Sequence, residues 1–201
     1  MEFNKKGQEV KYIRTEDLKK IREYLKYKNK ITLLNFINVG VNVGLRISDL
    51  STLRFEDIDM KTWTITLVEK KTQKKRNIKF NNICQKAIKE LKIFYQGLGY
   101  STKEGYLFKS LSPYQKKFKL DSPFTVNGVS REFKKIESFL NIPYPLGSHS
   151  LRKTWGKNVY EKTLNIGILM QAFNHSSPQI TLKYIGIEEE DINKLYDEFE
   201  I

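Results

Sequence analysis

The sequence predicts a mostly α-helical domain with one small antiparallel β-sheet, an α+β fold. Three observations support this prediction. Apolar residues recur at helical spacing over most of the 201 residues. The spacing changes to strict alternation in one stretch only, residues 63–80, where a basic segment separates two short apolar runs. The 39% of hydrophobic and 12% of aromatic residues are enough to build one buried core.

The N-terminal third is expected to be helical. Thr15 is followed by two acidic residues, a pattern typical of a helix start, and apolar residues then fall on one face. A second helix is predicted over about residues 30–43 and should end at Gly44. A short helix over residues 47–53 follows it.

The alternating stretch predicts a β-hairpin. Residues 63–67 and residues 78–80 alternate between apolar and polar side chains, whereas residues 69–76 are polar and strongly basic. The tip of the hairpin is therefore expected to carry Lys70, Lys71, Lys74, Lys75 and Arg76.

Helical spacing returns after the hairpin and continues to the C-terminus, with one interruption. Residues 97–124 contain several glycines and prolines and are predicted to be mostly loop. The predicted helices are residues 82–96, residues 126–140, one that begins near Ser150, residues 166–173, one that begins at Ser177 and Pro178, and one that follows Glu188.

The charge balance points to a polyanionic partner. The chain has 36 basic and 23 acidic residues, a net charge of +13. A domain this basic favours nucleic acid, although a solvated lysine-rich surface is the alternative reading. The lone cysteine, Cys84, falls in an apolar run and is expected to be buried. With one cysteine and two histidines, no disulfide or metal site is predicted. The chain has no carboxylate cluster and no Gly-rich phosphate loop, so no cofactor is predicted either.

No membrane segment is predicted. The first ten residues have no apolar core of the kind that secretory signals contain. The most apolar stretch, residues 31–45, is interrupted by one threonine and three asparagines. The expected protein is soluble and cytoplasmic, with no membrane partner.

Arg46 is the first candidate for chemistry. It lies between two apolar helices, where an unpaired guanidinium would be costly to bury. It therefore needs an anionic partner, which is either a ligand or a carboxylate such as that of Asp49 or of another helix.

Two pairs near the C-terminus are the other candidates. His149 and Arg152 are three residues apart at a helix start, where backbone N–H groups favour a bound phosphate. The alternative is a capping histidine and a surface arginine. His175 precedes the helix that begins at Ser177, and Tyr184 lies near the end of that helix. The alternative for Tyr184 is a half-buried aromatic, the usual role of a tyrosine.

Together these motifs resemble the catalytic domain of the tyrosine recombinase (phage integrase) family. The resemblance covers essentially the whole chain, and its specificity comes from the order and spacing of several short motifs. They are Gly44-Leu45-Arg46-Ile47-Ser48-Asp49-Leu50, then the basic hairpin with Lys71, then His149 and Arg152, then His175 and Tyr184.

The resemblance implies DNA strand cleavage and religation. Arg46 and Arg152 would hold the non-bridging oxygens of the scissile phosphate, because a guanidinium stays charged and pairs with phosphate in two places. His175 would donate a further hydrogen bond. Tyr184 would attack phosphorus, form a 3′-phosphotyrosyl link and release a 5′-hydroxyl, which conserves the bond energy for religation.

The resemblance also implies roles for two proton carriers. His149 would accept the proton of Tyr184, whose ordinary pKa is about 10. Lys71 would protonate the leaving 5′-oxygen as a general acid. A register slip of one or two residues in the hairpin would exchange Lys71 for a neighbouring lysine. The other cations of the hairpin would contact DNA phosphates: Lys70, Lys74, Lys75 and Arg76.

Two residues depart from the family pattern. Asn174 precedes the second histidine where the family usually has glycine, and Asn tolerates a left-handed backbone better than most residues. Asp49 replaces the usual glutamate.

The third departure concerns domains. Family members carry an N-terminal helical domain of about 100 residues that closes around DNA. Here residues 1–14 are expected to be an extension and residues 15–201 the catalytic domain, with no core-binding domain among them. The sequence is then either a catalytic fragment of a longer protein or a natural minimal protein.

The resemblance therefore predicts a bacterial or phage-encoded site-specific recombinase that acts on double-stranded DNA. The expected assembly is a tetrameric synapse on DNA, in which residues 188–201 pack on a neighbouring protomer. The main alternative is a DNA-binding regulator that keeps the fold without the chemistry. A topoisomerase-like activity is a third reading.

Overall fold

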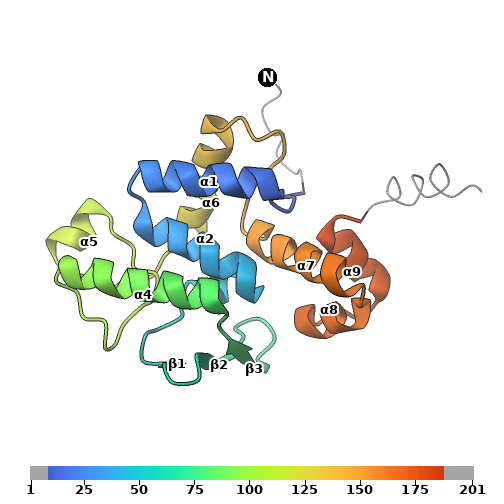
Figure 1. Ribbon diagram of the computed structural model, residues 1–201, viewed down its shortest axis with the longest axis horizontal. Coiled ribbons are helices and arrows are strands. Elements are labelled where there is room, and N and C mark those ends of the chain that lie inside the picture. Colours follow the sequence, from blue (N-terminus) through green and yellow to red (C-terminus); the bar gives the residue numbers. More distant parts are fainter. Residues whose placement is uncertain (1–8, 188–201) are drawn as a thin grey trace, which may run out of the picture.

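The computed structural model describes residues 9–187 and has the predicted architecture, helices with one small antiparallel sheet (Figure 1). The C-terminal helix predicted after Glu188 lies outside the described residues. The elements are α1 (Thr15–Tyr27), α2 (Ile31–Val43), α3 (Ile47–Leu50), β1 (Ile58–Asp59), β2 (Thr64–Val68), β3 (Lys75–Lys79), α4 (Asn82–Gly97), α5 (Pro113–Lys117), α6 (Val126–Phe139), α7 (Ser150–Thr163), α8 (Ile166–Phe173) and α9 (Pro178–Ile185).

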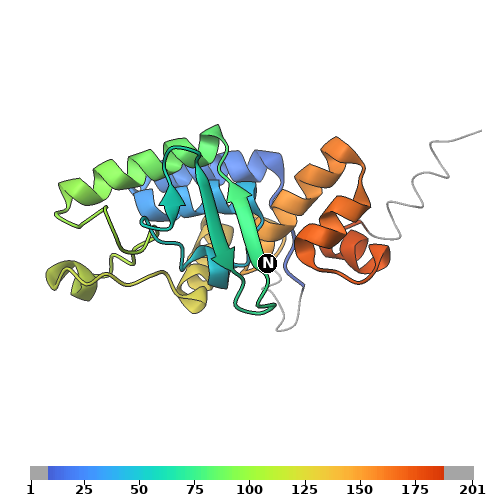
Figure 2. The ribbon, with the colours of Figure 1, turned by 90° about the horizontal axis from the view of Figure 1, so that it is seen from below.

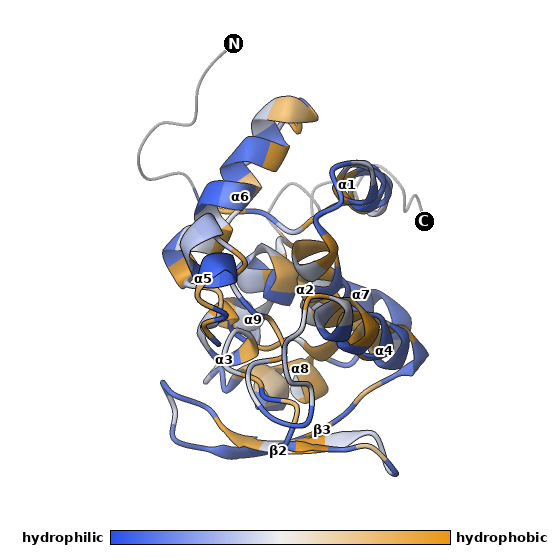
Figure 3. Cartoon of the chain, turned by 90° about the vertical axis from the view of Figure 1, so that its left-hand side faces the viewer, coloured by the Kyte–Doolittle hydropathy of each residue, from blue (hydrophilic) through white to orange (hydrophobic). Residues whose placement is uncertain are grey.

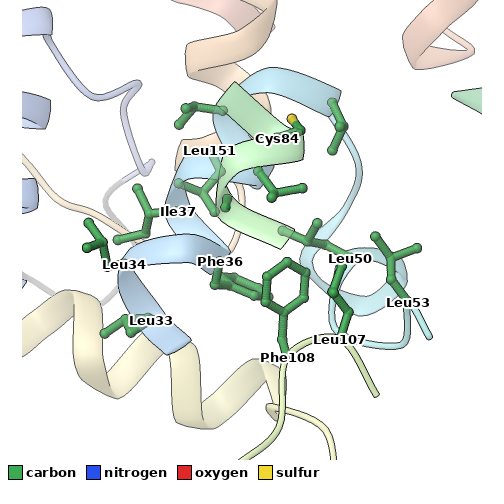
Figure 4. Close-up of a cluster of buried hydrophobic side chains, with 14 of the residues drawn as sticks. Leu33, Leu34, Phe36, Ile37, Leu50, Leu53, Cys84, Leu107, Phe108 and Leu151 are labelled. Carbon is green, nitrogen blue, oxygen red and sulfur yellow. The ribbon is translucent and has the colours of Figure 1, made fainter. Parts of the chain in front are cut away.

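Helix α2 is the centre of the domain. Ten of its 13 residues are buried, and it packs against α1, α4 and α7. At Gly40 a Cβ atom would lie 2.5 Å from the side chain of Leu151, so glycine allows α2 and α7 to approach closely. Figure 4 shows Phe36, Ile37 and Leu151 in this core.

A second, smaller core holds the C-terminal helices together. It consists of Leu169, Phe173 and Ile185, with Trp155 and Tyr184 packed against it. Figure 1 shows α7, α8 and α9 gathered at one end of the molecule. The helix that carries Tyr184 is therefore fixed mainly by α7 and α8.

The sheet has three strands in the order β1-β2-β3, all antiparallel. It forms a layer beneath the helices, as Figure 3 shows when the strands are seen on edge. Ile65 and Ile78 are paired and buried on one face, whereas Thr66 and Asn77 are paired and exposed on the other. The alternation in the sequence thus correctly predicted which side chains are buried.

The hairpin differs from the prediction at its ends. Trp63 has a φ of 56° and lies in the turn before β2, so it does not continue the strand. Lys75 and Arg76 lie in β3 and not in the turn. Strand β1 was not predicted, because two residues are too few to show a period.

Two helices also differ from the prediction. Residues 97–124, predicted as mostly loop, contain helix α5, which begins with a capping box between Ser112 and Gln115. None of its residues is buried, so it leaves no apolar pattern in the sequence. Helix α3 ends at Leu50, three residues earlier than predicted.

The segment before α1 packs against the domain. The N–H group of Lys11 donates to the carbonyl of Pro145 at 3.0 Å, and the N–H group of Ile13 donates to Oγ1 of Thr154 on α7 at 2.8 Å. Ile13 is buried in the main core. Across residues 9–187, no helix is long and apolar enough to cross a membrane.

Candidate active site

Arg46 lies between α2 and α3, and Gly44 sets its place. Gly44 ends α2 with a φ of 63°, and a Cβ atom there would lie 2.3 Å from the ring of Trp155. Arg46 then caps the start of α3 in an extended conformation. Its Nη1 atom donates to Oε2 of Glu69 at 2.8 Å, so its carboxylate partner comes from the hairpin and not from Asp49.

Asp49 has a different task. Its Oδ1 atom accepts a hydrogen bond from the backbone N–H of Lys70 at 3.0 Å. Asp49 is buried, and its Oδ2 atom has no hydrogen-bond partner among the described residues. The motif that supplies Arg46 therefore also anchors the start of the basic turn.

Arg152 is the most deeply buried cation of the site, with 3% of its side chain exposed. Its Nη1 atom donates to the carbonyl of Gly44 at 2.7 Å, and its Nη2 atom donates to the carbonyl of Phe173 at 3.3 Å. The guanidinium also lies over the Phe173 ring, 4.6 Å from its centroid. Burial lowers the pKa of Arg152 to about 10, which still leaves it charged at neutral pH.

Tyr184 and His149 form a hydrogen-bonded pair. The Tyr184 hydroxyl lies 2.9 Å from Nδ1 of His149. Burial raises the pKa of Tyr184 and outweighs the opposite effect of Arg152 and Arg46, so the phenol is protonated. Burial, followed by the charges of nearby cations, lowers the pKa of His149, so its imidazole is neutral. The phenol O–H can therefore donate to Nδ1.

Helix α9 carries Tyr184 and positions it beside His149. The Ser177 side chain accepts from the N–H of Ile180, and Pro178 occupies the first turn, as the sequence predicted. Thr181 is buried one turn before Tyr184. Its hydroxyl lies 3.1 Å from Nδ1 of His175.

His175 lies beside the nucleophile candidate. Its ring centroid is 5.2 Å from that of Tyr184, with the rings nearly perpendicular. Burial and the charges of Arg152 and Arg46 lower its pKa. The residue before it, Asn174, has a φ of 57° and a ψ of 48° at the end of α8. The expectation that Asn adopts the left-handed turn here is confirmed.

The hairpin brings Lys71 to the same site. Lys71 is exposed in the turn between β2 and β3, and its ammonium makes no hydrogen bond or ion pair with residues 9–187. It is close enough for its charge to lower the pKa of His149. Lys74 contacts the side chain of Asn174, which joins the hairpin to the turn before His175. Lys70 and Lys75 are exposed.

Arg76 behaves differently from the lysines around it. Its Nη1 atom donates to Oε1 of Glu69 at 3.1 Å and to the carbonyl of Ala172 at 3.3 Å. Its Nη2 atom donates to the carbonyl of Val43 at 3.3 Å. The guanidinium that was expected to contact DNA phosphates thus makes internal contacts that join the hairpin to α2 and α8.

Two charged residues at the site were missed by sequence reasoning. Glu69 binds Arg46 and Arg76, and it is the only acidic residue in the basic segment 69–76, a signal that could have identified it. Lys153 is buried, with its Nζ atom 5.1 Å from the centroid of the Tyr184 ring and in contact with the carboxylate of Glu9. Nothing in its sequence context distinguishes Lys153 from the other lysines.

The geometry thus brings the six predicted residues to one end of the molecule. Two guanidinium groups lie near a phenol that is hydrogen-bonded to a neutral imidazole, and the Lys71 ammonium is close enough for its charge to act on that imidazole. Cations of this kind stabilise the charge of a phosphate, and the imidazole can take the proton of the phenol. The arrangement suits attack by a tyrosine on a phosphodiester.

Solved structures of tyrosine recombinases have the same fold. The crystal structure of XerA recombinase aligns with a TM-score of 0.71 and 19% identity, over 96% of this chain and 66% of that one. A lambda integrase dimer bound to a core site aligns with a TM-score of 0.66 and 18% identity, over 92% of this chain and 62% of that one. At these identities the likeness shows the fold alone.

The sequence comparisons identify the family. The profile of the phage integrase family matches residues 11–191, and the chain belongs to this family. It is 32% identical to the probable integrase/recombinase YoeC of Bacillus subtilis, over 92% of this chain and 93% of that protein. It is 30% identical to a probable integrase/recombinase of Acholeplasma phage L2, over 92% of this chain and 60% of that protein. The predicted family and fold are confirmed.

Proposed function

We propose that this chain is a site-specific DNA recombinase that cleaves and rejoins DNA strands through a covalent intermediate on Tyr184. The observation that carries the proposal is the hydrogen bond of 2.9 Å between the Tyr184 hydroxyl and Nδ1 of a neutral His149. A tyrosine with a proton acceptor, set among arginines, has the parts that nucleophilic attack on phosphorus needs. The names of the relatives agree with this activity.

Arg46 and Arg152 would bind the scissile phosphate. Arg152 is held by backbone carbonyls and keeps its charge despite its burial. Arg46 is held by Glu69 on one side, with 19% of its side chain exposed for a ligand. His175 would donate to the same phosphate. Because these groups are fixed before the substrate arrives, they would stabilise the charge that develops on phosphorus.

Cleavage would proceed by one displacement at phosphorus. The Tyr184 oxygen forms a bond to phosphorus while the bond from phosphorus to the 5′-oxygen breaks. The phenol proton passes to His149, and Lys71 gives a proton to the 5′-oxygen, which leaves as a hydroxyl. In religation a 5′-hydroxyl attacks the 3′-phosphotyrosine, and each proton returns to its donor. No energy source is needed, because one phosphodiester is exchanged for another.

The test is the isolation of the covalent adduct. Duplexes that bind the protein would be selected from a random pool and rebuilt with a nick next to the cleaved position, so that the short 5′-hydroxyl strand diffuses away. The wild type should form a denaturation-resistant adduct with the labelled strand, and Tyr184→Phe should form none. If both proteins shift the DNA in a gel and neither is trapped, the chain is a DNA-binding regulator without strand-cleaving activity.

Self-association on DNA would complete the reaction. We propose a tetrameric synapse on double-stranded DNA, in which residues 188–201 pack on a neighbouring protomer. Exposed apolar side chains on α8 and α9 are available to receive such a segment, namely Ile168 and Ile180. Deletion of residues 188–201 should abolish cooperative binding to paired sites and leave binding to a single site intact. Unchanged cooperativity would remove this part of the proposal.

A further inference from the structure

Glu69 places a buried carboxylate inside the cluster of arginines. Its Oε2 atom accepts hydrogen bonds from Nη1 of Arg46 and from Oγ1 of Thr72, both at 2.8 Å. Its Oε1 atom accepts from Nη1 of Arg76 at 3.1 Å and lies 4.0 Å from Nη1 of Arg152. Only 7% of the Glu69 side chain is exposed. One carboxylate therefore contacts three guanidinium groups that belong to different elements.

The carboxylate is ionised in this position. Burial acts to raise the pKa of Glu69, but hydrogen bonds from Thr72, Arg46 and Arg76 outweigh it and lower the pKa. Three guanidinium groups and one carboxylate leave a net charge of +2 (three minus one). The cluster therefore stays positive and can stabilise the negative charge that develops on a bound phosphate.

Glu69 is also tied to the turn that carries Lys71. Its backbone N–H donates to the carbonyl of Lys74 at 3.0 Å, and its carbonyl accepts from the N–H of Gln73 at 2.8 Å. Because Thr72 donates its hydroxyl to the Glu69 carboxylate, both neighbours of Lys71 are held: Lys70 by Asp49 and Thr72 by Glu69. The same side chain that holds the arginines thus holds the lysine turn.

We propose that Glu69 is a positioning residue for strand cleavage, which fixes the Arg46 guanidinium relative to Arg152 and holds the Lys71 turn over the same phosphate. This inference rests on the proposed function, since it assigns Glu69 to the reaction of that site. The rival reading is an ion pair that only adds stability. The two readings differ in what they predict for the single-turnover rate at saturating protein.

The first experiment measures order in the free protein. Hydrogen exchange followed by mass spectrometry would compare the wild type with Glu69→Gln and with Glu104→Gln. Glu104 is exposed and far along the chain, so its variant removes the same charge and serves as the matched control. In Glu69→Gln the amides of residues 70–74 should exchange about tenfold faster, because the amide group replaces one acceptor with a donor that faces Arg76 or Arg46.

The second experiment measures the rate of adduct formation on the nicked duplex. At saturating protein, the single-turnover rate constant of Glu69→Gln should fall by about 10- to 100-fold, as expected for misplaced catalytic groups. The Kd for DNA should change by less than about threefold, because the cations that attract the phosphate remain. Thr72→Val keeps every charge and loses one hydrogen bond, so its rate should fall by a smaller factor. Glu104→Gln should match the wild type.

The outcomes separate this proposal from the function on which it rests. If the wild type forms no adduct but Glu69→Gln loosens residues 70–74, strand cleavage fails and the positioning of the turn stands. If Glu69→Gln cleaves at the wild-type rate, Glu69 has no positioning role. If the rate falls while exchange over residues 70–74 is unchanged, the carboxylate acts by another route and the proposal is overturned.

Discussion

At the scale of single residues, the protonation states of the site define the starting point of the proposed reaction. Tyr184 is a neutral phenol and His149 a neutral imidazole, because burial disfavours the charged form of each. The proton therefore has a nearby acceptor in the resting state. A site with a charged imidazole would lack that acceptor, so acid should switch the reaction off.

The first prediction concerns this pH dependence. The pKa of His149 is lowered below its ordinary value of 6.5, by burial first and then by Lys153 and Arg152. The neutral base is therefore present at neutral pH and is lost only as the pH falls through the lowered pKa. Cleavage measured at subsaturating protein, which reports the free enzyme, should be constant near pH 7 and decline with a midpoint below 6.5.

Its control uses the scarcity of histidines in this chain. The sequence contains two, so His175→Asn leaves His149 as the single imidazole for an NMR titration of the free protein. The pKa measured there should agree with the midpoint of the acid limb. A midpoint above 6.5, or a limb that survives in His149→Ala, would contradict the assignment of His149 as the base.

The candidate residues were predictable from the sequence, and their partners were not. Arg46, His149, Arg152, His175 and Tyr184 stand in short motifs of fixed spacing, which a reader of the sequence can recognise. Their partners lie far away in the chain: Glu69, which binds Arg46, follows it by 23 positions. The sequence therefore showed that Arg46 needs a carboxylate without showing which carboxylate it has.

At the scale of elements, the close contact between Gly44 and Trp155 places Arg46. Gly44 combines a left-handed backbone with contact against the Trp155 ring, so only glycine fits there. The turn after α2 then leads directly into Arg46. The carbonyl of Gly44 accepts a hydrogen bond from Arg152. The end of one helix thus determines the positions of both arginines.

The second prediction tests this turn. Gly44→Ala should destabilise the protein by about 2–4 kcal/mol, because alanine is strained at this φ and its Cβ would overlap the Trp155 ring. Gly97→Ala is the matched control: nothing lies within 4 Å of its Cβ position at the end of α4, and it should be neutral or slightly stabilising. Unfolding by urea measures both, and equal effects would refute the prediction.

Helices were predicted correctly where they are long enough for the spacing of apolar residues to repeat over several turns. The longer helices α1, α2, α4 and α6 show apolar residues at helical spacing over three or more turns, and the structure contains each of them. Helix α5 has five residues, none of them buried, and strand β1 has only two residues, so neither leaves such a pattern. The position of β1 is set by its pairing with β2, in which Ile58 lies opposite Ile65.

At the scale of the whole molecule, charge and its distribution determine how the proposed recombinase would bind DNA. The net charge is +13, and exposed lysines lie in the hairpin beside the site. Figure 2 shows the course of this hairpin, strands β2 and β3 and the turn that joins them. Each phosphate contact releases a counterion, so DNA binding should weaken steeply as salt rises. Each hairpin lysine that contacts a phosphate should add to the slope of log K against log salt.

The third prediction compares lysines by location. Lys70→Ala and Lys75→Ala should each reduce the slope of log K against log salt by about 0.9, the contribution of one phosphate contact. Lys86→Ala removes an equal charge from the exposed surface of α4 and should leave the slope unchanged. Equal slopes for all three variants would mean that the hairpin attracts DNA only through the total charge of the protein.

The small core of Leu169, Phe173 and Ile185 has a consequence for motion. Within residues 9–187, the helices around the proposed nucleophile Tyr184 share a core with three fully buried apolar residues, whereas Arg46 is flanked by Leu45 and Ile47 of the main core. Local unfolding is least costly where few apolar contacts are lost. The amides of α8 and α9 should therefore exchange at lower denaturant than those of α2, so that Tyr184 can move while Arg46, which directly follows α2, keeps its position.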